Sequence, residues 1–352
     1  MSKIKHIYWF AYYNLDEPSV RYRALYALQQ LEREHQITYD LVFPSYQLPA
    51  MLHFFRVYLA VLLGSRKQTV VVYQKIFSRG IYAQMLKLLL ALRPKNTLYD
   101  IDDAEYVRRP ASTIRYFMKR TAACAVGSQA LFEYAAALNK RTFMLTSPVI
   151  AHRQQHRDSL ANRQKQLRVG WIGYYDAHRD SLLSSFFPAL QQVDFEVKLI
   201  MLGVRRNWEW DEILATINNP AFVQVEADFD IDWHNEQAIY ACIASFDVGV
   251  SPLLDDDFNR AKSAFKLKQC LSCGVPVVAS KTGENAVFLQ EGVNGFFCET
   301  PADYLRHLCA IRLADEASYT AWSEAALRGT AAFDLKSYTH GLLQQLQLLA
   351  DD

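Results

Sequence analysis

The sequence predicts an α/β fold built from two similar halves, each a parallel sheet covered by helices. Short apolar runs alternate with amphipathic stretches along most of the chain, which is the pattern of repeated strand and helix units. Residues 152–166 interrupt this alternation, because they contain almost no apolar side chains. With 352 residues, the chain is long enough for two ordinary domains joined by such a linker.

Composition narrows the class of protein. Hydrophobic residues make up 51% of the chain and charged residues 21%, which is typical of globular proteins and excludes disordered and fibrous ones. We expect no signal peptide, and no apolar run reaches the roughly 20 residues that cross a bilayer. A cytoplasmic protein with six reduced, buried cysteines is therefore expected. Cys270 and Cys273 lack a second ligand pair at a spacing suited to zinc.

Charge is divided unevenly along the chain. The net charge is +1, yet residues 1–150 hold 20 Lys+Arg against 10 Asp+Glu, and residues 151–352 hold 18 against 27. This asymmetry fits two alternatives, a face that meets an anionic membrane or two domains that face each other. The first alternative places the protein peripherally on the inner face of a membrane.

The first half contains six expected strands, each an apolar run bounded by polar loops as in a buried parallel sheet. They cover residues 4–10, 39–43, 69–73, 96–101, 122–126 and 143–146. Helices are expected at residues 50–63 and 79–92, and another begins near Ser19, which is a good N-cap. The buried stripe of that helix consists of Ala24, Leu25, Leu28 and Leu31.

Arg21 and Arg23 follow Ser19 in the first turn of this helix. The helix dipole places partial positive charge there, and the neighbouring strand end is where open parallel sheets bind ligands. An anionic ligand would therefore stabilise both arginines. The alternative is that they pair with Asp16 and Glu17 or extend into solvent.

Three carboxylates, Asp100, Asp102 and Asp103, lie at the end of the fourth expected strand. Their mutual repulsion must be offset by a cation, by hydroxyl groups or by helix N–H donors, so the cluster is a candidate functional site. One alternative is a metal-binding site of the D-x-D kind.

The second half repeats the alternation. Strands are expected at residues 168–173, 197–202, 223–225, 247–251 and 275–280. Helices are expected at residues 235–245, from Thr300, where Pro301 and the capping acid Asp303 follow, and at residues 335–349. The last of these carries an apolar stripe of Tyr338, Leu342, Leu346 and Leu349.

Residues 262–298 organise the second half. They indicate a helix from Lys262, a tight turn at Gly274, a buried strand, and a polar turn at residues 281–285 before a short helix. Lys262, Lys266 and Gln269 are spaced four and three residues apart, so the helix places them on one face.

Both lysines are expected in the first turns of that helix, where the dipole is positive and backbone N–H groups are unpaired. A phosphate or diphosphate would stabilise this arrangement. The alternative is that the acidic residues just upstream, Asp255, Asp256 and Asp257, pair with the lysines.

These residues resemble the C-terminal signature of family 4 (group 1) glycosyltransferases of the GT-B type. The signature is carried by Lys262, Phe265, Lys266, Gln269, Cys273–Ser280 and Gly292–Gly295, and further matching segments are 18–23, 99–104, 127–129, 170–173 and 247–253. The resemblance implies two Rossmann-like domains facing a cleft. Residues 1–151 would form the acceptor-side domain, 152–166 the linker and 167–334 the nucleotide-sugar domain, with the C-terminal helix in 335–352 crossing back to the first domain.

The resemblance implies a retaining hexosyltransferase that moves a hexose from a nucleoside-diphosphate sugar to a glycan or lipid-linked acceptor. The enzyme would take part in the assembly of bacterial-type surface polysaccharides. The lysines in the signature helix resemble a lysine-bearing subgroup of the family. The nucleotide sugar is a co-substrate, no metal or other cofactor is required, and no nucleic acid is a partner. Alternatives are a binding protein that keeps the fold without turnover, and a nucleotide-sugar epimerase.

The resemblance also implies roles for particular residues. Lys262 and Lys266 would clamp the diphosphate, and Asp102 or Asp103 would orient the sugar or the acceptor hydroxyl. The expected donor-binding residues are Gly173, Arg179, Arg205, Gln269, Gly283, Glu284 and Asn285. The expected acceptor-side residues are Ser19, Arg21 and Arg23.

The chain departs from the family pattern at two acidic positions. The two family glutamates align with Ala261 and Gln269. Gln269 can still hydrogen-bond a ribose hydroxyl, whereas Ala261 cannot hold the donor sugar. That contact passes to Asp257 or Asn259, or is absent. The basic pair usual on the first loop of the second domain is also missing, with Arg179 the only nearby base.

Overall fold

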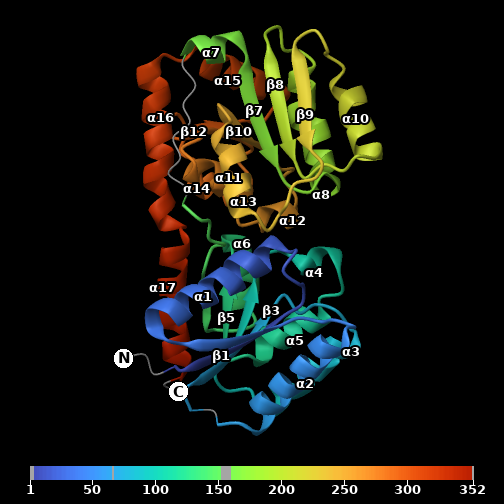
Figure 1. Ribbon diagram of the computed structural model, residues 1–352, viewed down its shortest axis with the longest axis vertical. Helices are drawn as coiled ribbons and strands as arrows, with labels where there is room; N and C mark the ends of the chain where they lie inside the picture. The colour runs from blue at the N-terminus through green and yellow to red at the C-terminus, as the bar shows by residue number, and fades with distance from the viewer. Residues whose placement is uncertain (1–3, 66, 152–159, 351–352) are drawn as a thin grey trace. The chain divides into compact units, whose positions relative to one another are not determined.

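The computed structural model describes residues 4–65, 67–151 and 160–350. The chain divides into two compact units (Figure 1). Unit 1 comprises Met1–Pro148, Arg260–Ser263 and Phe333–Asp352, and unit 2 comprises Val149–Asn259 and Ala264–Ala332. Most of the expected linker, residues 152–159, lies outside the described residues.

Unit 1 is built on a six-stranded parallel sheet in the order β2-β1-β3-β4-β5-β6. The strands are β1 (His6–Ala11), β2 (Thr38–Val42), β3 (Thr69–Gln74), β4 (Thr97–Ile101), β5 (Ala123–Val126) and β6 (Thr142–Met144). At the β2 side of the sheet, His6 of β1 is in register with Thr38 of β2 and Thr69 of β3. Strand β4 is buried at every position, as a parallel strand covered on both faces should be. All six strands predicted in this half are confirmed.

Helices cover both faces of this sheet. One face carries α1 (Tyr26–His35) and the C-terminal helix α17 (Leu335–Ala350), which pack together and bury the predicted α17 stripe (Figure 1). On the other face, Phe54 of α2 (Leu48–Leu63) packs on Phe10 of β1. The remaining helices of unit 1 are η1 (Val20–Leu25, a π-helical segment), α3 (Ile81–Leu92), α4 (Glu105–Arg108), α5 (Ser112–Arg120) and α6 (Gln129–Ala136). The terminal helix therefore returns to unit 1, as the resemblance implied.

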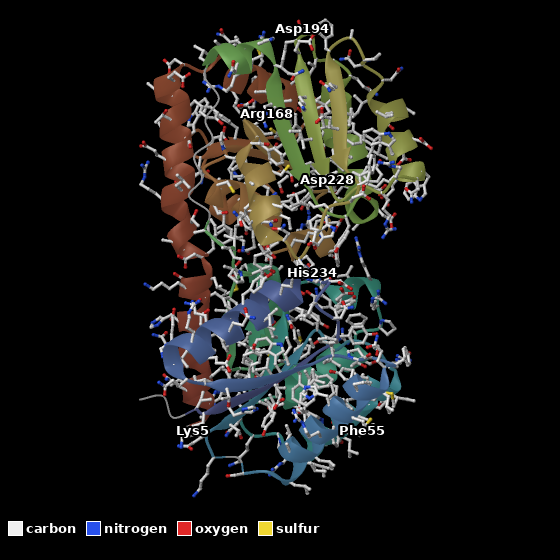
Figure 2. All side chains as sticks on the ribbon, in the orientation of Figure 1. Lys5, Phe55, Arg168, Asp194, Asp228 and His234 are labelled. Atoms are coloured by element: carbon white, nitrogen blue, oxygen red, sulfur yellow. The ribbon has the colours of Figure 1, made fainter. Side chains whose placement is uncertain are left out.

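Unit 2 contains a second six-stranded parallel sheet, in the order β12-β11-β10-β7-β8-β9. The strands are β7 (Leu167–Ile172), β8 (Val197–Leu202), β9 (Val223–Asp228), β10 (Val248–Ser251), β11 (Val277–Ala279) and β12 (Gly295–Phe297). In Figure 2, Arg168 and Asp194 mark the amino edge of this sheet and Asp228 marks its carboxyl edge. The short strand β12 was missed by the sequence analysis, because three residues after a glycine carry no periodic signal.

The helices of unit 2 pack around a core of apolar side chains from both faces of its sheet. They are α7 (Leu160–Lys165), α8 (Tyr175–Ser181), η2 (Leu182–Phe186, π-helical), α9 (Phe187–Leu190), α10 (Trp208–Ile217), α11 (Glu236–Ala244), α12 (Asp257–Arg260, which ends in unit 1), α13 (Phe265–Ser272), α14 (Asn285–Phe288), α15 (Pro301–Leu313), α16 (Glu316–Gly329) and η3 (Thr330–Ala332, 3-10). The capping box predicted for α15 is present between Thr300 and Asp303. None of the helices within the described ranges has the length and hydrophobicity needed to cross a membrane.

The prediction of Ser19 as an N-cap is wrong. Ser19 has helical dihedral angles, φ −62° and ψ −31°, and its side chain makes no cap hydrogen bond. Helical structure already begins at Pro18, whose ring restricts φ to helical values and which lacks an N–H group to satisfy.

The helix predicted from Lys262 begins three residues later. Ala264 is its N-cap and has a left-handed φ of 53°, so the chain turns there and α13 starts at Phe265. Lys266 therefore lies in the first turn of α13, whereas Lys262 lies outside the helix. The two lysines do not share a helix face.

The last part of the expected linker is a packed helix. Arg163 of α7 is completely buried and lies over the ring of Tyr319, 4.0 Å from its centre. It also donates a 3.0 Å hydrogen bond to the carbonyl of Ala314. The polar composition of this segment therefore does not make it an exposed connector, because the carbon atoms of long polar side chains pack well.

Candidate functional site

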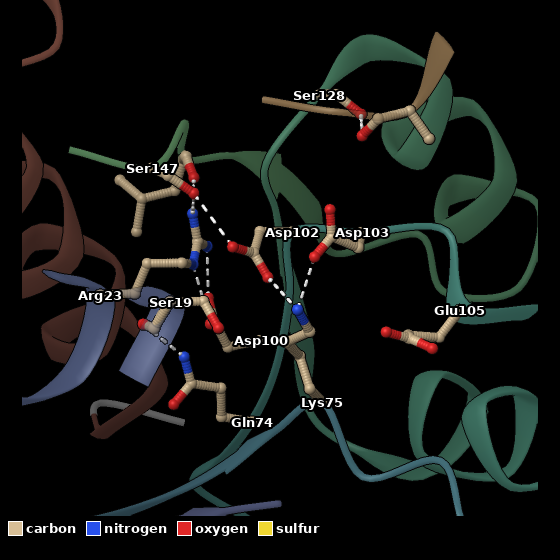
Figure 3. A network of polar contacts seen from close by, with 12 residues as sticks. Ser19, Arg23, Gln74, Lys75, Asp100, Asp102, Asp103, Glu105, Ser128 and Ser147 are labelled. Atoms are coloured by element: carbon tan, nitrogen blue, oxygen red, sulfur yellow. Dashed lines mark hydrogen bonds and ion pairs between the residues drawn. The ribbon is translucent and has the colours of Figure 1, made fainter. Parts of the chain in front are cut away.

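The topology of unit 1 marks one edge of its sheet for a ligand. The chain runs from β1 to β2 on one side and then returns to β3 on the other side of β1. Open parallel sheets bind ligands outside the carboxyl ends of their strands at such a reversal. The residues that follow β1, β3 and β4 include the acid cluster and its partners (Figure 3).

Arg23 is a core residue, so its prediction as an acceptor-side residue is corrected. Its Nε and Nη2 lie 3.0 and 2.5 Å from the two carboxylate oxygens of Asp100, and both side chains are fully buried. Its Nη1 donates to the carbonyl of Leu145 at 2.6 Å. Burial opposes the charge of Arg23, but Asp100 outweighs burial and raises the pKa of the guanidinium. Arg23 therefore neutralises one carboxylate of the cluster.

Lys75 neutralises the other two carboxylates. Its Nζ lies 3.2 Å from Oδ1 of Asp102 and 2.6 Å from Oδ2 of Asp103, and only 2% of its side chain is exposed. Burial opposes its charge, yet Asp102, Asp103 and Glu17 raise the pKa of Lys75 well above its ordinary value. The offsetting cation that the sequence analysis required is supplied by the chain itself. Ser147 adds a hydroxyl hydrogen bond of 3.2 Å to Asp102.

Sequence reasoning missed the surroundings of Lys75. This lysine directly follows β3 and has a left-handed φ of 52°, so the chain turns sharply at the carboxyl edge of the sheet. Burial raises the pKa of Glu17, although Lys75 acts against it. Burial also raises the pKa of Tyr13 to about 12, and Lys75 lies 5.7 Å from the centre of its ring. A charged residue immediately after a buried strand was the available signal.

Arg21 supports the loop after β1. Only 2% of this residue is exposed, and its Nη1 donates to the carbonyls of Leu15 and Asp16 at 2.7 and 2.9 Å. It bonds backbone oxygens in place of the acceptor that was predicted for it, so that assignment is corrected as well.

Ser19 sits beside this loop. Its carbonyl accepts a 2.9 Å hydrogen bond from Gln74 at the end of β3. Its hydroxyl is buried, and no partner lies within hydrogen-bonding distance in the described part of the chain. Ser19 is thus the one acceptor-side prediction that keeps an unused polar group near the carboxyl edge.

Unit 2 has the same type of topological reversal between β7 and β10. Lys266 of α13 and His178 of α8 meet there, with 2.6 Å between Nζ and Nε2. An ammonium group can only donate, so Lys266 in its charged form donates to Nε2 of His178. His178 was not singled out by the sequence analysis, because it stands 88 residues from Lys266.

Gly173, the residue after β7, accommodates Lys266. A Cβ at Gly173 would lie 3.0 Å from Cε of Lys266, and its φ of 152° is unusual for residues with side chains. The lysine stem therefore passes directly over the end of β7. The structure brings together Gly173 and Lys266, two residues that were predicted for donor binding.

The turn after β11 is held by Asn285. Its Nδ2 donates to the carbonyls of Ser251 and Ser280 at 3.1 and 3.2 Å, which fastens this turn to the end of β10. The backbone N–H of Asn285 donates to Thr282 at 3.3 Å, so this group is not the predicted diphosphate donor. Glu284 beside it is 4% exposed, and Gly283 has a left-handed φ of 55°.

Arg179 of α8 pairs with an acidic side chain of α10. Its Nε and Nη2 lie 2.7 and 2.5 Å from the two carboxylate oxygens of Glu212 on α10. Hydrogen bonds from Arg179 hold the pKa of Glu212 below its ordinary value. The donor-binding role of Arg179 stays a prediction, and its guanidinium is paired with Glu212 in this structure. Arg205, which follows β8, is 72% exposed and 3.9 Å from Glu209.

Most of unit 2 matches a known protein family. Residues 165–312, which include Gly173, His178 and Lys266, match the family model described as glycosyl transferases group 1. No curated protein sequence matches the chain.

Solved structures share the fold of nearly the whole chain. Anabaena HepE in complex with UDP-glucose has a TM-score of 0.68 at 13% identity, covering 97% of this chain and 99% of that one. Sucrose-phosphate synthase from Thermosynechococcus elongatus has a TM-score of 0.70 at 13% identity, covering 99% and 100%. The lipopolysaccharide outer core galactosyltransferase WaaB in its apo form has a TM-score of 0.64 at 11% identity, covering 97% and 98%. These structures confirm the predicted GT-B fold.

The two departures from the family pattern are both buried. Gln269 is 4% exposed on α13, within the residues that match the family model. Ala261 is completely buried, and its carbonyl accepts a 2.7 Å hydrogen bond from Ser128 Oγ. Ser128 also caps α6, so the segment around Ala261 is held by unit 1. Lys262 therefore belongs to unit 1, whereas Lys266 belongs to unit 2.

Metal ligation was an alternative for the acid cluster of unit 1. Lys75 and Arg23 already neutralise its three carboxylates, as described above. Across residues 4–65, 67–151 and 160–350, no three His, Cys, Asp or Glu side chains are grouped so that they could hold a metal ion. Asn259, considered as a sugar contact, donates to Asp256 at 2.8 Å.

Proposed function

We propose that this chain transfers a hexose from a nucleoside-diphosphate sugar to a glycan or lipid-linked acceptor, with retention of anomeric configuration. The observation that carries the proposal is the Lys266–His178 pair at the β7/β10 reversal, inside a group 1 glycosyl transferase domain. A cytoplasmic location, peripheral at the inner face of a membrane, and a role in surface polysaccharide assembly belong to the same proposal. WaaB, a lipopolysaccharide outer core galactosyltransferase, is a structural neighbour that motivates this role.

On the donor side, Lys266 would stabilise the diphosphate as it departs. The bond between the anomeric carbon and the diphosphate oxygen breaks, and negative charge develops on that oxygen. A preorganised cation in a site shielded from water lowers the barrier for this step. His178 accepts a hydrogen bond from Lys266 and so orients its ammonium. Gln269 is proposed for the ribose, and Gly173, Arg205, Gly283 and Glu284 for the remainder of the nucleotide.

On the acceptor side, we assign orientation of the incoming hydroxyl to Asp102 and Asp103. Lys75 lies 3.2 Å from Asp102 and 2.6 Å from Asp103, and carboxylate oxygens accept hydrogen bonds from an incoming hydroxyl. The acceptor oxygen forms the new bond to the anomeric carbon as the diphosphate leaves, and its proton passes to the departing diphosphate oxygen. Lys262 in unit 1 is proposed as a second cation for the diphosphate, as in the lysine-bearing subgroup. The donor is a co-substrate, and no cofactor is required.

The proposal is tested by ligand-induced stabilisation with nucleoside diphosphates and their sugars. A ligand at 100 times its Kd raises the free energy of unfolding by about 2.7 kcal/mol, which a thermal shift detects. Because HepE is seen with UDP-glucose, UDP and UDP-glucose are the first probes. Lys266→Gln is expected to weaken UDP binding about ten- to hundredfold, which corresponds to the loss of charge-assisted hydrogen bonds.

A matched control is Lys198→Gln. Lys198 lies near the amino end of β8 and pairs with Glu226 at 2.8 Å, so it stands at the opposite edge of the same sheet. This variant should bind UDP as the wild type does. Equal affinity of the Lys266→Gln and wild-type proteins for every nucleoside diphosphate that binds would contradict the donor assignment.

A non-catalytic nucleotide-sugar-binding protein is the second candidate. It is favoured by Ala261 and Gln269, which replace both acidic residues of the family pattern. Release of sugar from the donor separates the two candidates. Tight binding of a nucleoside diphosphate without sugar release, across a panel of donors and acceptors, would establish the binding protein.

A further inference from the structure

The outer face of α2 in unit 1 is apolar and exposed. Its side chains recur at spacings of four, three, four and four residues, so they lie on one side of the helix. They are Leu48, Leu52, Phe55, Leu59 and Leu63, each between 45% and 78% exposed. Phe55 is labelled on this helix in Figure 2. Helix α3 adds Ile81, Leu88 and Leu92, which are 81%, 57% and 51% exposed.

The opposite side of α2 is packed on the sheet. Phe54, Val57, Tyr58 and Val61 are all buried. The Phe54 ring lies 6.3 Å from that of Phe10 in β1 and 5.3 Å from that of Tyr82 in α3. Helix α2 is therefore apolar on both sides. A surface helix normally exposes polar side chains to solvent. The exposed apolar side chains of α2 therefore indicate an interaction surface.

Basic residues outnumber acidic ones around this face, and Arg56 on α2 itself pairs with Asp40 of β2 at 3.3 Å. The sequence from Leu41 to Tyr99 contains no aspartate or glutamate but eight lysines and arginines. Lys75 is buried in the acid-cluster site, whereas Lys67, Arg79 and Lys95 are exposed. Arg93 donates to the carbonyls of Val61 and Gly64, which ties the end of α3 to the end of α2. The cations and the apolar side chains thus belong to one connected surface, the α2–α3 face.

We propose that the α2–α3 face docks on an anionic lipid bilayer. The apolar side chains would enter the boundary between headgroups and acyl chains, while the flanking lysines and arginines bind lipid phosphates. Sixteen residues of α2 extend about 24 Å, so the helix can lie along the membrane surface over its full length. Docking accounts for the apolar face and the excess of basic residues together.

A second copy of the chain fits this face less well. A self-complementary interface would place the same basic surface opposite itself, and like charges in contact oppose association. An anionic bilayer offers both an apolar layer and negative charge. The purpose of docking, access to a lipid-linked acceptor, rests on the proposed function. Vesicle binding itself does not, because it requires no sugar transfer.

The test is flotation of the full chain with phosphatidylcholine vesicles that contain about 30% phosphatidylglycerol. Wild-type protein should float with these vesicles, and binding should weaken when salt rises from about 0.1 to 0.5 M. The double variant Leu52→Glu/Leu59→Glu should bind at least about tenfold more weakly. The matched control is Leu214→Glu on α10 of unit 2, where the leucine is 44% exposed, and it should bind as the wild type does.

Three results would overturn the docking surface. The wild type does not bind anionic vesicles, the double variant binds as well as the wild type, or the chain is a dimer that the double variant dissociates. The thermal response to UDP is measured on the same samples. A protein that responds to UDP but ignores vesicles contradicts the docking alone, whereas vesicle binding without any nucleotide response contradicts the donor site alone.

Discussion

Replacing Lys75 by methionine tests the electrostatics of the unit 1 site. Methionine keeps most of the side-chain volume, so the change is mainly the loss of charge. Lys75 contacts Asp102 at 3.2 Å and Asp103 at 2.6 Å, and these carboxylates are 8% and 28% exposed. Removing one partner from a buried ion pair costs about 3–5 kcal/mol, because the other charge stays buried without compensation.

The cost should depend on pH in a defined direction. Burial raises the pKa of Glu17 while Lys75 lowers it, so the variant shifts this pKa further upward. A carboxyl group whose pKa is raised by folding destabilises the folded state as pH rises through and above its ordinary value of 4.5. The stability deficit of Lys75→Met should therefore be smallest near pH 5 and larger near pH 7.5.

Denaturant unfolding followed by tryptophan fluorescence measures this deficit. Trp9 is buried in the unit 1 core and is the one tryptophan of this unit, so it reports the unfolding of unit 1. The control is Lys198→Met, which breaks the partly exposed pair with Glu226 and should cost at most about 1 kcal/mol. A Lys75→Met deficit no larger than that of the control, or one that grows on acidification, would refute the reasoning.

Three further predictions concern unit 2. Burial and Arg306 lower the pKa of His307 from 6.5, so its contribution to the free energy of unfolding is complete above pH 6.5 and is lost as the pH falls below that value. The melting temperature should therefore fall between pH 7.5 and 5, and His307→Gln should make this fall smaller. Gly203→Ala should cost about 1–3 kcal/mol or more in urea unfolding, since φ is 98° and a Cβ would lie 2.0 Å from the Gly173 carbonyl; no loss would contradict this close approach. Thr300→Ala should cost about 0.5–2 kcal/mol by removing the α15 cap, whereas Thr300→Ser should restore it, and equal melting temperatures would refute the capping role.

The predictions about the fold that succeeded depend on residues close together in the sequence. The strands of unit 1 were predictable because short apolar runs bounded by polar loops are typical of parallel strands that are buried on both faces of a sheet. The cap of α15 and the buried stripe of α17 were predictable for a similar reason, since each depends on neighbours within one or two turns of helix. The start of α13 was not, because the left-handed φ of Ala264 leaves no mark in residue type.

The candidate site was only partly visible in the sequence. Lys266 and Gly173 were identified from local patterns, and the acid cluster was recognised as needing a neutralising partner. The partner itself came from elsewhere in the chain: Arg23 meets Asp100 across 77 residues, and Lys75 meets Asp103 across 28. Nothing in the sequence indicated that Arg179 pairs with Glu212, which lies 33 residues away.

The sequence by itself determined the α/β class, the two-part organisation and the family resemblance, because periodicity and short motifs are local properties of the chain. Tertiary structure decided which charges are buried, which of them pair, and that Lys262 and Lys266 belong to different units. It also showed that α2 is apolar on its outer side as well as its inner one. These features depend on desolvation and on contacts between distant residues, and packing alone sets both.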